Sequence, residues 1–368
     1  MTMNNEQYFL PHDRLQDLIS TLQQSKYRCI GPQVRDGAIV YDVLRSVDQL
    51  PWGITDKQEP GKYRLEETSD KKAFGWVNGP QAVKPLLFVP QETLWKVERD
   101  AEGKLEFKST EAEAEPVAVF GIRPCDLAAM EIQDKVFIHD EYVDPRYKTR
   151  RENLFTIVMN CTKSSANCFC VSAGGSTKAE KGFDLAMTEI KGGFVIEAGS
   201  DNGNAILALL KLEPAKPETI SQANELVEKA ADAQTKKLPA GDLNKKLFEN
   251  LNHPQYEDVA KRCLSCTSCT QVCPTCFCHS EGDKAVLDGS SSEHIRQWDS
   301  CFTEGHSYIV GTVIRKDTAS RYRQWITHKL GSWHDQFGTS GCVGCGRCIT
   351  WCPAGIDITE EVNKICKK

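Results

Sequence analysis

The stretch RCLSCTSCTQVCPTCFCHS, from Arg262 to Ser280, carries six cysteines in one short run of chain. Its first four follow the spacing C-x2-C-x2-C-x3-C-P, and the same spacing recurs in GCVGCGRCITWCP, from Gly341 to Pro353. Two intervening residues let a loop curl so that successive thiolates reach successive irons of one cubane, and this spacing is typical of bacterial-type [4Fe–4S] sites. The two runs therefore predict two [4Fe–4S] clusters in the C-terminal part of the chain.

The fourth cysteine of each run is expected to bind the other cluster, because the proline after it turns the chain away from the first. The ligands are thus exchanged between the runs. Cluster 1 is expected to be bound by Cys263, Cys266, Cys269 and Cys352, and cluster 2 by Cys342, Cys345, Cys348 and Cys273. Zinc also takes four cysteines, but two copies of the run with the same proline favour iron–sulfur clusters.

Four further cysteines lie in the first half of the chain, namely Cys125, Cys161, Cys168 and Cys170. Cys125 and Cys161 each follow an expected strand, so neighbouring strand ends could bring them together. Four thiols are the number that a cubane or a zinc ion needs. We expect a third [4Fe–4S] cluster here, and the alternatives are a zinc site or thiols that are merely buried or reactive.

A last group, Cys276, Cys278 and Cys301, is one ligand short of a closed site. Cys276 and Cys278 directly follow the first run, so they are expected to line the surroundings of its cluster and tune its potential. The alternative is an extra metal site completed by a ligand other than cysteine. The eight histidines form no ligand pair at helical spacing and are expected to be surface or core residues. Cys29 and Cys366 are isolated and are expected to be ordinary residues.

The rest of the composition is that of an ordinary globular protein. The chain has 368 residues, 40% hydrophobic and 26% charged, which suits two or three domains. Its net charge of −6 argues against a nucleic-acid binder, and its apolar runs are too short to span a bilayer. The N-terminus has no secretory pattern. Seventeen cysteines, many of them clustered, occur without an export signal, so we expect a cytoplasmic protein whose cysteines bind metal. We expect no membrane partner.

Hydrophobic periodicity predicts an α+β fold, with an N-terminal mixed α/β domain at 1–211, a linker and surface helix at 212–241, and a dicluster domain at 242–368. In the first domain, helices are expected at 11–25 and 125–137, and strands at 84–90, 116–121, 154–161 and 192–200. Between the two cysteine runs, the segments 294–301, 306–317 and 321–337 are expected to be helices. An α-helical ferredoxin-like domain is therefore favoured over a compact domain that contains strands.

Six longer strings give the chain a family resemblance. They are LPWGITDKQEPGKYRL (Leu50–Leu65), GIRPCDLAAM (Gly121–Met130), NCFCVSAG (Asn167–Gly174), CPTCFC (Cys273–Cys278), QWDSC (Gln297–Cys301) and GCVGCGRC (Gly341–Cys348). With them the chain resembles the iron–sulfur β subunit of cytoplasmic NAD(P)-linked [NiFe] hydrogenases, or sulfhydrogenases, and the corresponding iron–sulfur subunit of anaerobic sulfite reductase. The first string favours the hydrogenase type.

The resemblance implies an electron-transfer subunit that is not catalytic alone. It would relay single electrons between a flavin subunit, which holds FAD and handles NAD(P)H, and a catalytic subunit of a [NiFe] hydrogenase or a sulfite reductase. A redox sensor or regulator is the alternative of another class, but a sensor would usually carry a DNA-binding element. No G-x-G-x-x-G or Walker A run indicates a nucleotide site in this chain itself.

Overall fold

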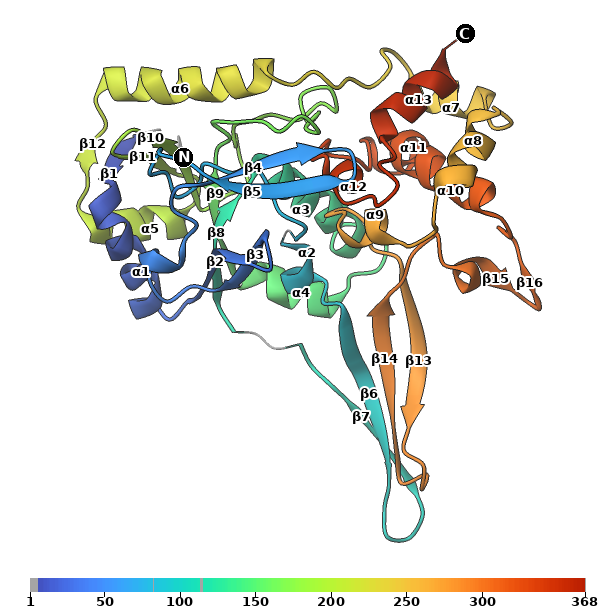
Figure 1. Cartoon of the computed structure of the whole chain (residues 1–368). Coiled ribbons are helices and arrows are strands. Elements are labelled where there is room, and N and C mark those ends of the chain that lie inside the picture. The colour runs from blue at the N-terminus through green and yellow to red at the C-terminus, as the bar shows by residue number, and fades with distance from the viewer. Residues whose placement is uncertain (1–5, 82, 113–114, 368) are drawn as a thin grey trace.

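The computed structural model of the chain describes residues 6–81, 83–112 and 115–367 (Figure 1). It combines a large sheet covered by helices, a four-stranded arm that projects from the body, and a C-terminal helical region that holds both cysteine runs. The expectation of an α+β protein is therefore correct.

The large sheet has eight strands, of which the central four run parallel and the outer ones antiparallel. In spatial order the strands are β12 (Glu213–Pro214), β1 (Tyr8–Pro11), β11 (Gly193–Ala198), β10 (Leu185–Ile190), β9 (Leu154–Met159), β8 (Val117–Ile122), β2 (Arg28–Arg35) and β3 (Ala38–Val43). Every residue of β9 and β10 is buried, as expected for parallel strands covered on both faces. The strands expected at 116–121, 154–161 and 192–200 are confirmed as β8, β9 and β11.

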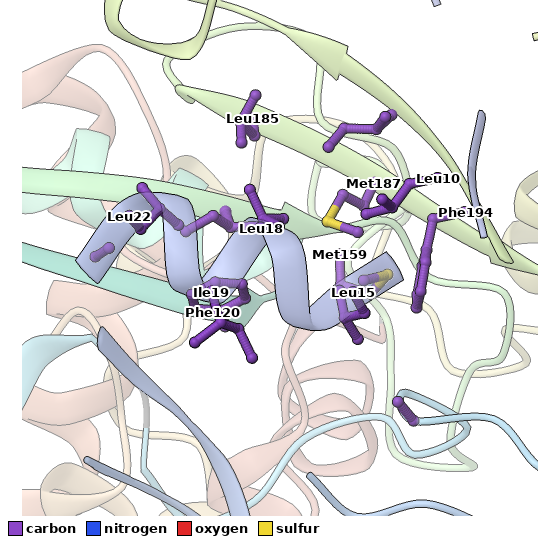
Figure 2. Close-up of a cluster of buried hydrophobic side chains, with 14 of the residues drawn as sticks. Leu10, Leu15, Leu18, Ile19, Leu22, Phe120, Met159, Leu185, Met187 and Phe194 are labelled. Carbon is purple, nitrogen blue, oxygen red and sulfur yellow. The ribbon is translucent and has the colours of Figure 1, made fainter. Parts of the chain in front are cut away.

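Helices cover both faces of this sheet. On one face lie α1 (Leu15–Gln24), which follows the 3₁₀ helix η1 (His12–Arg14), and α5 (Asp201–Leu210). On the other lie α3 (Pro124–Phe137), α4 (Pro145–Glu152) and α6 (Pro217–Asp232). Figure 2 shows Leu15, Leu18, Ile19 and Leu22 of α1 pointing onto the strands. These residues recur every three to four positions, and this spacing predicted the helix. The helices expected within 11–25 and at 125–137 are confirmed.

The strand expected at 84–90 is wrong, because the structure has a one-turn helix there, α2 (Lys84–Leu87). A short apolar run does not by itself distinguish a strand from a buried helix. Pro85 lies in the first turn of α2, where its fixed φ suits a helix and its missing N–H costs nothing. In a sheet the same proline would remove a ladder hydrogen bond.

Three more sheets are small. The arm has the strand order β13 (His279–Ala285), β14 (Ser291–Trp298), β6 (Gln91–Arg99) and β7 (Leu105–Ser109), and it extends away from the body (Figure 1). The hairpins are β4 (Ile54–Glu59) with β5 (Lys62–Glu67), and β15 (Tyr308–Ile309) with β16 (Thr312–Val313). The 3₁₀ helices η2 (Val47–Gln49) and η3 (Glu304–Ser307) complete these parts.

The helices expected at 294–301 and 306–317 are therefore wrong. Most of the first segment is strand β14, whose antiparallel neighbours are β13 and β6. The second contains the β15–β16 hairpin, which turns through Val310 and Gly311, both at positive φ. Consecutive residues of this kind form a type I′ turn and cannot continue a right-handed helix. The region between the cysteine runs is thus a mixture of helix and strand.

The C-terminal helices surround a third core. They are α7 (Leu243–Glu249), α8 (Gln255–Arg262), α9 (Ser268–Gln271), α10 (Thr318–Thr327), the π-helix η4 (His328–Ser332), α11 (Trp333–Phe337), α12 (Arg347–Thr350) and α13 (Ile358–Cys366). The helical segment expected at 321–337 is confirmed as α10, η4 and α11. Within the described residues, no helix is long and apolar enough to cross a membrane.

Candidate metal centres

The two cysteine runs take the same local backbone shape. In the first run, Ser265 and Thr267 have left-handed φ angles of 48° and 67°, although neither is glycine. At the corresponding places of the second run, Gly344 and Gly346 have φ angles of 65° and 77°. Such angles are uncommon for residues that carry a Cβ, so the first run adopts this curl against the preference of its own residues. Each run then enters a one-turn helix, α9 or α12.

Backbone amides face cysteine sulfurs at matching places in both loops. The N–H of Ser265 donates to Cys263 Sγ, and the N–H of Gly344 donates to Cys342 Sγ, each over 3.4 Å. Hydrogen bonds of this kind stabilise the negative charge of a thiolate and are one way in which a protein sets the potential of a cluster. Both loops are therefore built to hold thiolates.

The first group of cysteines lines one pocket near the surface. Cys263, Cys266 and Cys269 come from the first run, and Cys352 comes from the end of the second. Cys266 is exposed, whereas the other three are partly buried. Aromatic rings complete the wall of this pocket, from Phe302, Tyr322 and Trp325. The fold therefore brings the four residues expected for cluster 1 to one place, and Cys348, which is expected for cluster 2, lines the same pocket.

The second group lies deeper, with Cys342, Cys345 and Cys348 near Cys273. Burial raises the pKa of Cys342 to about 12, Lys329 opposes this rise, and the thiols of Cys273 and Cys345 add to it. Burial also raises the pKa of Cys348 well above its ordinary value, and the nearby thiols of Cys342, Cys345 and Cys273 raise it further. The four residues expected for cluster 2 thus lie close enough to act on one another. Binding of iron here requires their protons to leave.

The four N-terminal cysteines also meet. Cys125 lies in the first turn of α3, Cys161 follows β9, and Cys168 and Cys170 lie in the loop between β9 and β10. Burial raises the pKa of Cys161 to about 12, Arg123 opposes this, and the thiols of Cys170 and Cys168 raise it further. Parallel strands are usually joined by a helix, but residues 160–184 form a loop without regular structure, which is typical of a functional segment.

This loop packs directly on the second cysteine run. The N–H of Phe169 donates to the carbonyl of Gly344 over 2.9 Å. A Cβ on Gly344 would lie 2.6 Å from the Cα of Cys170, which is too close for any side chain. The charge of Cys345 also acts on Cys168. The N-terminal cysteine group and the second group are therefore neighbours, which the sequence did not indicate because their spacing along the chain is large.

The remaining cysteines, Cys276, Cys278 and Cys301, line one cavity together with His306. Cys276 lies beside Cys273 of the second group, and this neighbour raises the pKa of Cys276 well above its ordinary value. Cys278 instead pairs with Cys301, and this hydrogen bond lowers the pKa of Cys278. His306 contacts Cys278 as well, although no pattern in the sequence distinguished this histidine from the others.

The two isolated cysteines stay apart from these groups. Cys29 is buried on β2, where burial raises its pKa to about 11, and Cys366 lies on α13. Neither joins a group of thiols in the described part of the chain, which fits the expectation of ordinary residues.

One buried ion pair connects the second run to the large sheet's helices. Arg347, between Cys345 and Cys348, is 1% exposed and forms a bidentate pair with Asp126 of α3 over 2.7 and 3.2 Å. Its Nε also donates to the carbonyl of Gly79 over 2.9 Å. The sequence could not show this pair, because its two members are far apart along the chain.

As the side chains stand, no group of three or more His, Cys, Asp or Glu residues in the described ranges is arranged to hold a metal ion. The donor sets nevertheless fit thiolate-bound clusters in number and in chemistry, since each of the first three groups offers four cysteines. A cubane also separates its ligands more widely than a single ion does, because each thiolate binds a different iron.

Residues 262–356 match the model of a family described as a 4Fe-4S dicluster domain. This segment contains both cysteine runs, and the match supports two [4Fe–4S] clusters in this part of the chain. The chain is also 28% identical over 309 residues to sulfhydrogenase 2 subunit beta of Pyrococcus furiosus, covering 82% of this chain and 89% of the relative. The two matches support the family of iron–sulfur hydrogenase β subunits that the sequence motifs indicated. No solved structure matches the chain significantly.

Proposed function

We propose that the chain relays single electrons between a flavin subunit that uses NAD(P)H and the catalytic subunit of a [NiFe] hydrogenase. The carrying observation is the duplicated cysteine run, with one backbone shape in both copies and with Cys352 of the second run in one pocket with three cysteines of the first. The similarity to a sulfhydrogenase β subunit supports the hydrogenase type over a sulfite reductase. The alternative of a redox sensor gains no support from the described part of the chain.

The protein's own residues would control the potential and the access of water. When bound, a [4Fe–4S] cluster takes up and releases one electron at a time. The amides of Ser265 and Gly344 donate to sulfurs, and the guanidinium of Arg347 lies beside Cys345, where the carboxylate of Asp126 offsets part of its positive charge. Hydrogen bonds and positive charges near a cluster favour its reduced form, and burial in an apolar site opposes extra charge.

A third [4Fe–4S] cluster, bound by Cys125, Cys161, Cys168 and Cys170, is part of this proposal. Its support is the burial of these thiols and their position next to Cys345 of the second group. The three groups would then form one continuous route from the cysteines of the N-terminal domain to those of the dicluster domain. Short steps between neighbouring centres are what electron transfer needs.

The route would reach the surface at cluster 1. Cys266 is exposed, and its neighbour Leu264 has 68% of its surface exposed. The β15–β16 hairpin, in the same C-terminal region, also exposes apolar residues, among them Tyr308, Ile309 and Val310. Exposed apolar groups of this kind are typical of protein interfaces. We assign this side to a partner subunit of a cytoplasmic complex, with FAD and NAD(P) bound by the flavin partner.

Purification of the native complex tests the proposal directly. The chain is tagged in its own host, isolated without oxygen, and its partners are identified by mass spectrometry. Recovery of a flavoprotein together with a [NiFe] hydrogenase subunit is the expected result. Recovery of sulfite reductase subunits would move the chain to that branch, and recovery of the chain alone would contradict a subunit role.

The dicluster assignment predicts a loss of iron from single substitutions. Cys269→Ser and Cys348→Ser should each lower the iron content by about four atoms per chain, because each removes one of four ligands of a different cluster. Iron is measured by mass spectrometry of anaerobic protein, and the reduced clusters by EPR. Cys29→Ser is the matched control, since Cys29 joins no group. Full iron in either ligand variant would contradict the ligand role of the substituted cysteine.

A further inference from the structure

We propose that Cys276, Cys278, Cys301 and His306 bind an additional [4Fe–4S] cluster. This inference rests on the proposed electron relay and extends it by one centre. The three cysteines and the histidine would then all be ligands of one cluster, which their spacing along the chain could not reveal.

The arm's hairpin brings these side chains together. Cys278 precedes β13 and Cys301 follows β14, and the strands pair so that His279 stands opposite Trp298. The N–H of Asp299 donates to the carbonyl of Cys278 over 2.8 Å and closes the base of the hairpin. The 3₁₀ helix η3 then returns His306 to the same place. All four proposed ligands line one cavity of about 110 Å³, together with residues of α10, η4 and α11.

The histidine is oriented as metal-binding histidines commonly are. Its Nδ1 lies 3.2 Å from Oδ2 of Asp299, and its ring also contacts Cys278. A carboxylate that accepts from one ring nitrogen fixes the tautomer and leaves the other nitrogen as a ligand. Asp299 is therefore the positioning residue of this site, and His306 supplies the ligand that the cysteine group lacks.

Two buried lysines give the site a positive surrounding. Lys329 Nζ donates to Thr275 Oγ1 over 2.9 Å and to the carbonyl of Gly341 over 3.1 Å. Lys84 Nζ donates to the carbonyl of Gln271 over 3.1 Å and lies 3.9 Å from the centre of the Trp298 ring.

Both lysines are largely buried, with 5% of Lys84 and 6% of Lys329 exposed. In the part of the chain that the structure describes, neither forms an ion pair with a carboxylate. Both lie within electrostatic range of Cys273, Cys276 and Cys278, and Lys329 also of Cys342 and Cys348, so the two lysines face the second group as well as the proposed site. A buried ammonium group without a counter-charge is costly. Thiolates bound to a cluster supply that charge.

The space between the ligands favours a cluster over a single ion. Zinc stands about 2.3 Å from thiolate sulfur, so a zinc site closes on itself and leaves no cavity among its ligands. Here the four ligands share a cavity of about 110 Å³ with residues of α10, η4 and α11, which leaves room for a cluster. The position beside Cys273 of the second group also suits a redox centre, because Cys276 lies within electrostatic range of that cysteine.

Iron analysis of the full-length protein tests the inference. Cys278→Ser and Cys301→Ser should each lose about four irons per chain relative to the unsubstituted protein, since each removes one ligand of one cubane. Cys366→Ser is the matched control and should keep all iron. Zinc is measured in the same samples. Full iron in Cys301→Ser, or a loss of one zinc in place of iron, would overturn the proposal.

The histidine ligand has a spectroscopic test that begins with the unsubstituted protein. Protein labelled with ¹⁵N-histidine and reduced anaerobically should show a nitrogen coupling to one cluster in pulsed EPR. That coupling should vanish in His306→Ala, while His306→Cys should keep the iron without the coupling. Absence of any coupling in the unsubstituted protein would remove His306 as a ligand. Iron loss in Cys269→Ser with full iron in Cys278→Ser would refute this site and leave the two-cluster relay intact.

Discussion

Arg347 shows how one residue in a cysteine run can serve the rest of the molecule. Its guanidinium is fully desolvated and holds both oxygens of Asp126, which lies at the start of α3 beside Cys125. Asp126 also accepts a hydrogen bond from the N–H of Arg123 over 3.2 Å. The pair therefore connects the helix that carries Cys125 with the loop that carries Cys345, and a buried pair of this kind is costly to break.

Removal of this guanidinium should destabilise the protein strongly. In Arg347→Ala, Asp126 is left as an unpaired buried charge, and the loss of stability is expected to be about 3–5 kcal/mol. Arg347→Lys should recover only part of it, because an ammonium cannot bind both oxygens as a planar fork does. Thermal unfolding of the iron-loaded protein under anaerobic conditions measures the effect.

An exposed pair supplies the control for this prediction. Lys229 contacts Glu225 over 3.6 Å, and both side chains are exposed, at 73% and 61%. Such pairs contribute at most about 1 kcal/mol. Lys229→Ala should therefore shift the unfolding temperature little, and an equal shift in the Arg347 and Lys229 variants would refute the structural role of the buried pair.

Among the elements, the arm depends on an ionic network at its base. Glu92 of β6 accepts from Arg150 of α4 over 2.6 Å and also pairs with Arg296 of β14. Arg296 in turn pairs with Asp144 at the start of α4. The carboxylate of Glu92 is only 7% exposed. This network fixes the arm to α4, while the rest of the arm projects into solvent (Figure 1).

The arm should therefore loosen at its base in acid. Burial alone would raise the pKa of Glu92, but the hydrogen bonds and charges of Arg150 and Arg296 outweigh it and hold this pKa below its usual value. The stabilisation is thus present above the pKa of an unfolded glutamate, about 4.3, and is lost as the pH falls through the lower pKa of the folded state. Hydrogen exchange of β6 and β14, followed from about pH 6 downward, should show faster opening in that window.

Glu92→Gln should open this base already at neutral pH and lose most of the acid dependence. Glu98→Gln is the control on the same strand, because Glu98 pairs with Lys108 in full contact with solvent. If the amides of β6 and β14 exchanged as slowly in Glu92→Gln as in Glu98→Gln, the ionic network would not be required to hold the arm.

Helices and strands whose own residues show a clear periodicity could be predicted from the sequence. Those that form only by pairing with a segment far away in the sequence could not. Helix α1 repeats apolar residues every three to four positions, so its sequence alone defines it. Strand β14 has no such signal, because its partner β6 lies some two hundred residues earlier in the chain. The site shows the same division. Cysteine spacing identified the two clusters, whereas the nearness of His306 to Cys278 and of Arg347 to Asp126 exists only in the fold.

For the whole molecule, the decisive contact is that between the loop at 160–184 and the second cysteine run. Gly344 lies at its centre, because it combines a left-handed backbone with contact to Cys170 and a hydrogen bond from Phe169. On the other side of that run, Asn78 Nδ2 donates to the carbonyl of Cys345 over 2.9 Å. Loops of the large sheet thus contact the second run at both Gly344 and Cys345. The N-terminal cysteine group and the second group should therefore assemble together.

Gly344→Ala should separate these parts and remove more than one cluster. The new Cβ would stand 2.6 Å from the Cα of Cys170, so the two loops must move apart, and the N-terminal group and the second group should both lose iron, about eight atoms together. Gly37→Ala is a matched control, since Gly37 also has a positive φ, of 72°, but has no atom within 4 Å of its added Cβ. It carries the same backbone strain, about 1–2 kcal/mol, without the clash. Iron content of both variants decides the matter: loss of about four irons in Gly344→Ala would mean that the two groups assemble independently, and loss of none would mean that the contact is not required.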